Sequence, residues 1–128
     1  MVVDEALPPG LAANAVGVLA FTLGATLPAL VGAELLDADG DRHPGLIPLG
    51  LPVLAAPSSE LSALRDQARA TELGVIDFPT HGQKTTDYDE FRMQLAQLPA
   101  SRIKYLGLLI YGPRRVVSKL TGRLHLLR

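Results

Sequence analysis

The sequence predicts a single α/β domain, and three stretches carry that prediction. Met1–Asp4 reads as a short strand, which a Pro-Pro-Gly turn joins to a long apolar helix over 11–25. Lys104–Ile110 is an apolar run typical of a strand buried on both faces, and Gly112-Pro113 then opens another helix. Strands that alternate with helices indicate an α/β fold, in which ligands gather at the carboxyl ends of strands and at helix N-termini.

Length and composition favour one domain in a reducing compartment. The chain has 128 residues without a linker, repeat or low-complexity segment, so we expect residues 1–128 to share one core. The absence of cysteine excludes disulfides, thiolate metal sites and a cysteine nucleophile, and it fits a cytoplasmic location. Asp4 and Glu5 stand where a signal peptide would be positively charged, so we expect no export signal.

The helix over 11–25 is apolar or small nearly all round, which predicts that it is buried. The stretch 11–30 is long enough to be weighed as a membrane span. Asn14 and Pro28 interrupt it, however, and no cations flank it. We therefore expect a core helix and no membrane association.

The segment 30–54 is irregular. Three aspartates alternate over 37–41 as in a calcium loop, but Arg42 and Pro48 stand where that loop needs glycine and glutamate. The Asp39-Gly40 pair favours a hairpin turn instead. The histidines lack metal-ligand spacing, so we expect neither a metal nor another cofactor.

Further elements follow in order. They are a strand over 51–55, a helix over 58–72, a strand over 74–78, a helix over 86–98, a helix over 113–122 and a half-buried strand over 123–126.

The C-terminal part of the chain is basic. From residue 101 onward there are seven basic residues and no acidic one. Such a face attracts phosphate, although a solvated basic helix is the common alternative. Predicted helix starts at Leu11 and Pro113 also offer free N–H groups to an anion. The candidate ligand-binding residues are Asp4, Gly10, Arg114, Arg115 and Lys119.

Three side chains are candidates for catalysis. Asn14 can make two directed hydrogen bonds from the first helix, either to a substrate or as a brace to a loop. His81 follows a predicted strand and is either a general base near neutral pH or an exposed loop histidine. Lys84 is a cation in the same loop. We expect these residues and the start of the last helix to meet at one end of the sheet.

The end of the chain resembles the C-terminal signature of type II peptidyl-tRNA hydrolases, with a spacing two residues shorter. The matching residues are Gly112-Pro113, Lys119-Leu-Thr-Gly122 and Leu124-His-Leu-Leu127. The whole chain is more similar to an uncharacterised bacterial family, the "domain of unknown function two thousand". That family's pattern covers Val2-Val-Asp-Glu5, Leu7-Pro-Pro-Gly-Leu-Ala-Ala-Asn14, Tyr105-Leu-Gly107 and Tyr111-Gly-Pro113. The resemblance implies a peptidyl-tRNA hydrolase II-like fold in three α/β/α layers, with a small mixed sheet of four or five strands and a homodimer.

The resemblance also implies a function. In the hydrolases the first helix opens with a lysine held to be important for hydrolysis, and that position is Gly10 here, while Asn14 replaces a glutamine. One hypothesis is hydrolysis of an ester in peptidyl-tRNA or a related acyl-nucleotide, with Asn14 orienting the substrate and Lys84 or His81 substituting for the lysine. The alternative is a non-catalytic homodimeric module that binds an anion or a nucleotide. The partner is then tRNA or a phosphate-bearing small molecule.

Overall fold

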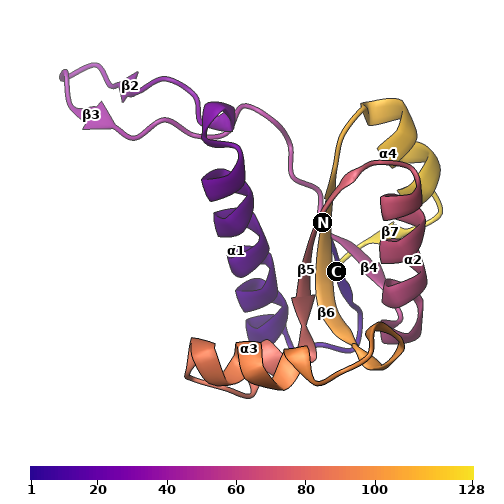
Figure 1. Ribbon diagram of the computed structural model, residues 1–128. Helices are drawn as coiled ribbons and strands as arrows, with labels where there is room; N and C mark the ends of the chain where they lie inside the picture. The colour runs from indigo at the N-terminus through magenta and orange to yellow at the C-terminus, as the bar shows by residue number, and fades with distance from the viewer.

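A five-stranded mixed sheet forms the middle layer of the protein (Figure 1). The structure, a computed structural model, describes residues 1–128 apart from the side chain of Gln83. The sheet has the order β5-β6-β1-β4-β7, with β1 at Val2–Asp4, β4 at Leu54–Ala56, β5 at Gly74–Pro79, β6 at Tyr105–Tyr111 and β7 at His125–Leu126. Strand β1 runs parallel to β4, whereas β6 runs antiparallel to both β1 and β5. The prediction of a small mixed sheet is therefore confirmed.

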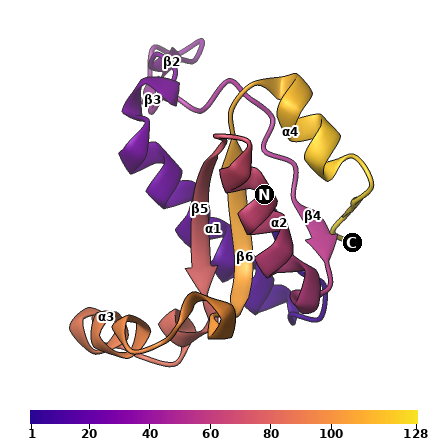
Figure 2. The ribbon, with the colours of Figure 1, turned by 45° about the vertical axis from the view of Figure 1, so that its right-hand side comes forward.

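Helices cover both faces of the sheet (Figures 1 and 2). They are α1 at Pro9–Thr26, α2 at Ser58–Ala70, α3 at Tyr88–Ala96 and α4 at Arg114–Thr121, with short 3-10 turns η1 at Pro28–Leu30, η2 at Thr80–Gln83 and η3 at Ala100–Arg102. Helix α1 lies on one face, and α2 with α4 lies on the other. Helix α3 packs against η2 near one end of the sheet. The helices and sheet strands expected from the sequence are all present, with ends shifted by at most three residues.

The core is split by the sheet into two apolar layers. On the α1 side, Leu19 and Leu23 pack against Val3 and Leu109. On the α2 side, Leu61 belongs to a cluster that also contains residues of β1, β4 and β6. Strand β6 contributes to both layers and is buried over most of its length, as its continuous apolar run predicted.

The prediction that α1 is buried all round is wrong. Its buried residues are Ala12, Ala15, Leu19 and Leu23, which form the single stripe that faces the sheet. Phe21 on the other side is 81% exposed. The reason is geometric, because a helix that packs on the outside of a sheet contacts it along one face, and no further layer of this chain covers the opposite face.

Residues 31–50, which we call the arm, project away from the body beside the end of α1 (Figure 1). The arm carries a two-stranded hairpin of β2 at Leu35–Leu36 and β3 at Arg42–His43. At its tip the Asp37 carboxylate accepts the N–H groups of Asp39 and Asp41, both at 2.9 Å. Gly40 adopts a φ of +86°, a conformation that suits glycine in a turn. The predicted hairpin turn is confirmed.

Candidate functional site

The candidate residues are divided between the two ends of the sheet. Because β1, β4 and β5 are parallel to one another, their carboxyl ends share one end, where Asp4 and His81 lie. Strand β6 runs the other way and therefore delivers Arg114 to the opposite end (Figure 1). The expectation that all candidates meet at one end is wrong, and the antiparallel direction of β6 is the cause.

The first end has the strand topology at which α/β proteins commonly bind ligands. Strands β1 and β4 are adjacent and parallel, and the helices that follow them, α1 and α2, leave on opposite faces of the sheet. Both helices start after a proline, at Pro8 and Pro57, and no side chain caps either of them. The chain itself crosses this end, since the Glu5 N–H donates to the Ala56 carbonyl at 3.0 Å and the Asp4 carboxylate accepts the Ala6 N–H at 3.1 Å.

The three candidate catalytic side chains do not form a common site. Asn14 and Lys84 are exposed, and neither side chain bonds to another described residue. His81 is half-buried, and its Nδ1 atom is buried without a hydrogen-bond partner among the described atoms. The expectation of an exposed loop histidine is therefore wrong, since η2 tucks this residue against the end of β5.

Sequence reasoning missed a polar cluster on the α2 face. Arg65 of α2 donates through Nε to Asp77 of β5, and its guanidinium carbon lies 5.4 Å from the centre of the Tyr105 ring. A register shift explains how Tyr105 reaches this face. Phe78 pairs with Gly107, but Pro79 pairs with Tyr105, so β6 contains a bulge at the residue between them. A bulge turns the side chain before it to the other face of the sheet.

This cluster shifts two proton equilibria. The hydrogen bond that Arg65 donates to Asp77 is the main cause that raises the pKa of Arg65, which keeps the guanidinium charged. Burial raises the pKa of the Tyr105 phenol, with the nearby Arg65 charge acting in the opposite direction. The side chains of Arg65 and Asp77 are 19% and 28% exposed, so solvent screens this ion pair less than one at the surface. Its three members lie too far apart in the sequence to be recognised as a group.

The opposite end of the sheet holds a hollow beside the candidate residue Arg114. A cavity of about 770 Å³ lies between the base of the arm and α4. Leu27, Ile47 and Leu49 line it on the arm side, and Arg114 and Ser118 line it on the α4 side. Arg114 carries the one charged side chain among the described residues of the lining.

Tyr111 forms part of the floor of this cavity and covers a glycine. Gly74 pairs with Tyr111 across β5 and β6, and a Cβ atom on Gly74 would lie 2.1 Å from Cζ of the tyrosine ring. The ring therefore rests directly on the backbone of β5. Glycine is required at this position because any side chain would displace the ring.

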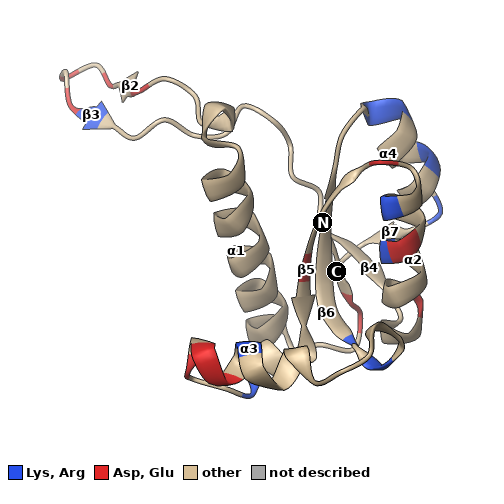
Figure 3. Ribbon diagram, in the orientation of Figure 1, with Lys and Arg blue, Asp and Glu red and all other residues tan. Residues whose placement is uncertain are grey.

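The outer surface of α4 is basic, as the sequence indicated (Figure 3). Arg114, Arg115 and Lys119 are exposed, and none of them forms an ion pair with a described residue. Arg123, after the helix, is instead engaged with Glu60 of α2 at 3.0 Å. The three free cations and the N-terminus of α4 thus remain available to an anion at this end.

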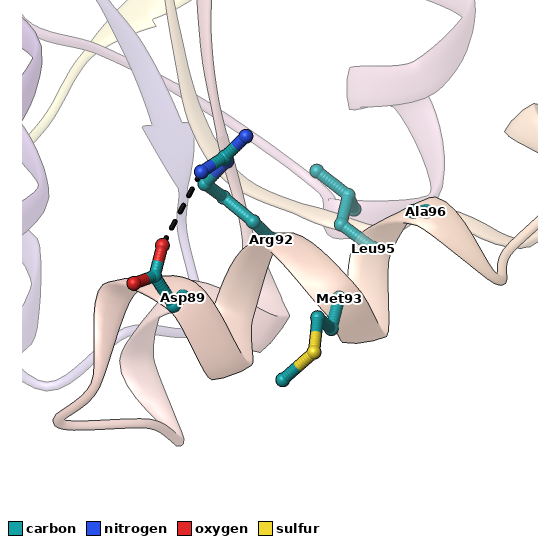
Figure 4. A pocket seen from close by; sticks show the side chains of 5 residues that line it. All are labelled: Asp89, Arg92, Met93, Leu95 and Ala96. Atoms are coloured by element: carbon teal, nitrogen blue, oxygen red, sulfur yellow. Dashed lines mark hydrogen bonds and ion pairs between the residues drawn. The ribbon is translucent and has the colours of Figure 1, made fainter.

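A second hollow lies on α3 alone (Figure 4). Its lining residues are Asp89, Arg92, Met93, Leu95 and Ala96, all on that one helix. Arg92 is directed back to Asp89, at 3.2 Å, and both side chains are largely exposed. No second element contributes to this hollow, so it is a surface feature of a helix and not a built site.

The fold and the cavity define the class: a small three-layer α/β protein with a cation beside an apolar hollow. Its family is that described as "Protein of unknown function (DUF2000)", to which the chain belongs because the family model matches residues 1–128. The family expected from the sequence is thereby confirmed.

Comparison of structures identifies one similar protein of known structure. It is Atu0240 from Agrobacterium tumefaciens strain C58, itself described as a protein of unknown function. The TM-score is 0.88 at 16% sequence identity, and the match covers 98% of this chain and 93% of that one. This similarity shows the fold alone. No curated protein matches the chain.

Proposed function

We propose that the protein is a non-catalytic module that binds a small amphiphilic anion in the cavity between the arm and α4. The observation that carries this proposal is the position of Arg114, the one charged side chain among the described residues that line a largely apolar cavity. Met1 also lines the cavity, and its amino group donates to the Pro52 carbonyl at 2.7 Å. A largely apolar wall beside the Arg114 guanidinium selects a ligand that has an apolar body and a carboxylate or phosphate head.

The size of the cavity supports this assignment. Its volume of about 770 Å³ lies within the range of roughly 300–1,000 Å³ that small-molecule sites occupy. Leu27, Ile47 and Leu49 would contact the apolar body of the ligand. Each methylene that leaves water for such a wall contributes about 0.8 kcal/mol.

The start of α4 supplies the polar part of the site. Pro113 is the N-cap and provides no side-chain cap, so the first N–H groups of the helix have no partner from a capping side chain. They add to the Arg114 guanidinium, whose planar fork matches a carboxylate or phosphate. Ser118, one turn further on, offers a hydroxyl to the same cavity. A nucleotide is the most polar ligand that this arrangement would accept.

The test uses 8-anilinonaphthalene-1-sulfonate, a fluorescent anion with an apolar body, as the probe. Arg114→Gln should weaken probe binding about tenfold or more, because a hydrogen bond to a charged group contributes about 1.5–3 kcal/mol. Arg115→Gln is the matched control, since Arg115 is equally exposed but does not line the cavity. Its effect should stay within about twofold.

Competition experiments then distinguish which anionic head group and which apolar body the ligand has. Decanoate, adenosine monophosphate and inorganic phosphate are added to the bound probe. Displacement by decanoate alone indicates an acyl carboxylate, and displacement by the nucleotide indicates a phosphate ligand. The proposal fails if the probe does not bind to the folded protein, or if the two arginine variants lose affinity equally.

Ester hydrolysis in peptidyl-tRNA or a related acyl-nucleotide is the second candidate, in line with a peptidyl-tRNA hydrolase II-like fold. One observation favours it, namely the buried Nδ1 atom of His81, which has no partner among the described atoms near the carboxyl end of β5. In this hypothesis Asn14 orients the substrate and Lys84 substitutes for the lysine that Gly10 replaces. The cost of losing an oxyanion donor is about 3–4 kcal/mol unless another cation takes its place.

The assay for this candidate is release of free tRNA from N-blocked aminoacyl-tRNA, with Asn14→Ala, His81→Ala and Lys84→Ala beside the wild type. Activity that a folded variant loses would support the hydrolase. Binding of tRNA to the basic α4 face should weaken steeply with salt, since each phosphate contact releases counterions. An absence of cleavage together with a flat salt response would reject both roles for tRNA.

A further inference from the structure

We propose that the outward face of α1 and the arm form the interface of a symmetric homodimer. This inference does not rest on the ligand proposed for the cavity, although Leu49 belongs to both surfaces. It assigns a location and an occupant to an apolar surface that the described residues leave uncovered.

Three glycines on α1 point to close approach by another molecule. Gly10, Gly17 and Gly24 recur every seven residues and therefore lie on the same side of the helix. An added Cβ would meet nothing within 4 Å at any of them, so the protein's own fold does not require glycine there. Glycine destabilises the interior of a helix relative to alanine. A neighbour whose backbone packs against this face would account for glycine at Gly17 and Gly24, which lie inside α1.

Large apolar side chains surround these glycines. Phe21 lies between Gly17 and Gly24 and is 81% exposed. The other exposed apolar residues of α1 and the arm are Leu11, Val18, Val31, Leu35, Leu36, Leu46 and Leu49. Together with Phe21 they present on the order of 700 Å² of apolar surface. This is close to the roughly 800 Å² per partner that a standard stable interface buries.

The arm lacks support within its own protomer. Its strands pair only with each other, and the hydrogen bond from the Gly32 N–H to the Leu46 carbonyl, at 2.9 Å, joins two residues of the arm itself. An isolated two-stranded hairpin is at best marginally stable in water. The arm leaves the body on the side of α1 that faces away from the sheet (Figures 1 and 2). A partner seated on α1 would therefore also cover the arm.

The charge pattern of α1 is compatible with a second copy of the chain as the partner. No charged residue occurs between Glu5 and Glu34, so α1 is uncharged throughout (Figure 3), and the charged residues of the arm lie in its hairpin, at Glu34, Asp37, Asp39, Asp41 and Arg42. In a twofold dimer each face meets itself, and a charged face would then meet charges of its own sign. A neutral face with glycines and one large aromatic side chain has no such repulsion, and Phe21 of each copy can fill the space above a glycine of the other.

A membrane surface is the other occupant to consider. Of the helices that the structure describes, α1 alone is long and apolar enough to cross a bilayer. Its inner stripe, which includes Leu19 and Leu23, is nevertheless part of the core of the protein and would be lost on insertion. Helices that lie on membranes usually carry cations on their polar face, and α1 has none.

The test measures the oligomeric state of the full chain by sedimentation velocity, over protein concentrations that rise to about 100 μM. The wild type should be a dimer in this range. Phe21→Asp should be a monomer with an unchanged circular dichroism spectrum. Leu126→Asp is the matched control, because Leu126 is also an exposed apolar residue, at 55%, but lies on β7 at an edge of the sheet. This control should remain a dimer.

Gly17→Ala keeps the test decisive if Phe21→Asp fails to fold. The added methyl group meets no atom of its own protomer, so the unfolding midpoint of the monomer should rise, while the dimer dissociation constant increases about tenfold or more. A wild type that stays monomeric at the highest concentration overturns the proposal. A dimer that Leu126→Asp dissociates and Phe21→Asp does not would also overturn it, as would a monomer that sediments with phosphatidylcholine vesicles.

Discussion

Replacement of Gly74 by alanine should destabilise the protein through a clash with one tyrosine. The new Cβ would lie 2.1 Å from Cζ of Tyr111 and 2.4 Å from its Cε2, whereas carbon atoms in contact are about 3.5 Å apart or more. The ring must therefore retreat by more than about 1 Å from a packed position. Overpacking of this kind costs about 1–3 kcal/mol, which lowers the melting temperature of a domain of this size by roughly 3–12 °C.

The sign of the effect should reverse when the ring is absent. In a Tyr111→Ala background the space above Gly74 is open, and alanine in a strand is then more stable than glycine by about 0.5–1 kcal/mol. The coupling between the two positions is thus roughly 2–4 kcal/mol, as measured by a double-mutant cycle in urea. Gly50→Ala is the control, since its Cβ would meet nothing within 4 Å and should change stability by less than about 0.5 kcal/mol. Equal destabilisation by Gly74→Ala in both backgrounds would refute the argument.

Three further outcomes are expected. Asp77→Asn removes the partner of the half-buried Arg65 and should lower the free energy of unfolding in urea by about 1–3 kcal/mol. Asp66→Asn, at an exposed contact of 3.2 Å to the same guanidinium, should lower it by less than about 0.5 kcal/mol. Similar losses of stability in the two variants would contradict an effect of burial. Burial raises the pKa of Tyr105 in the folded state, so the stability that its protonated phenol contributes is fully present below about pH 10 and is lost as pH rises through the folded value. Absorbance at 295 nm should show a late ionisation that Tyr105→Phe removes. Simultaneous titration of all tyrosines would disprove this. Backbone hydrogen bonds lower the pKa of Asp37, so its contribution to the arm tip is present above about pH 4 and is lost as pH falls through the folded value. Carboxyl NMR should give Asp37 a midpoint below the ordinary value of an aspartate, and an ordinary midpoint would argue against the turn.

Local signals in the sequence were sufficient to predict the secondary structure. Glycine and proline mark the ends of most elements, as at Gly112 and Pro113 before α4, and Asp87 caps α3 through the N–H groups of Asp89 and Glu90. The apolar run of β6 indicated a central strand because both of its faces are buried. These features depend on neighbours along the chain, which a single sequence contains.

The arrangement of the elements depends on long-range pairing and was predicted less well. Nothing in the residues of β6 indicates its direction relative to β1, and this direction decides that Arg114 and His81 lie at opposite ends of the sheet. The bulge that places Tyr105 beside Arg65 is equally a property of pairing between β5 and β6. The apolar face of α1 was misassigned to the core, because composition gives the polarity of a face and not the identity of the molecule that covers it.

The position of β1 at the centre of the sheet also constrains how the protein is made. Val2 pairs with Leu54 on one side and with Leu108 on the other, so both strands that pair with β1 come later in the chain. At roughly 5–20 residues per second, a ribosome needs about 5–20 s to deliver β6 after β1 has emerged. Until then α1 has no completed sheet to pack on, and both of its apolar sides are open to water. Nascent chains of this protein should therefore complete their folding only after β6 has left the ribosome.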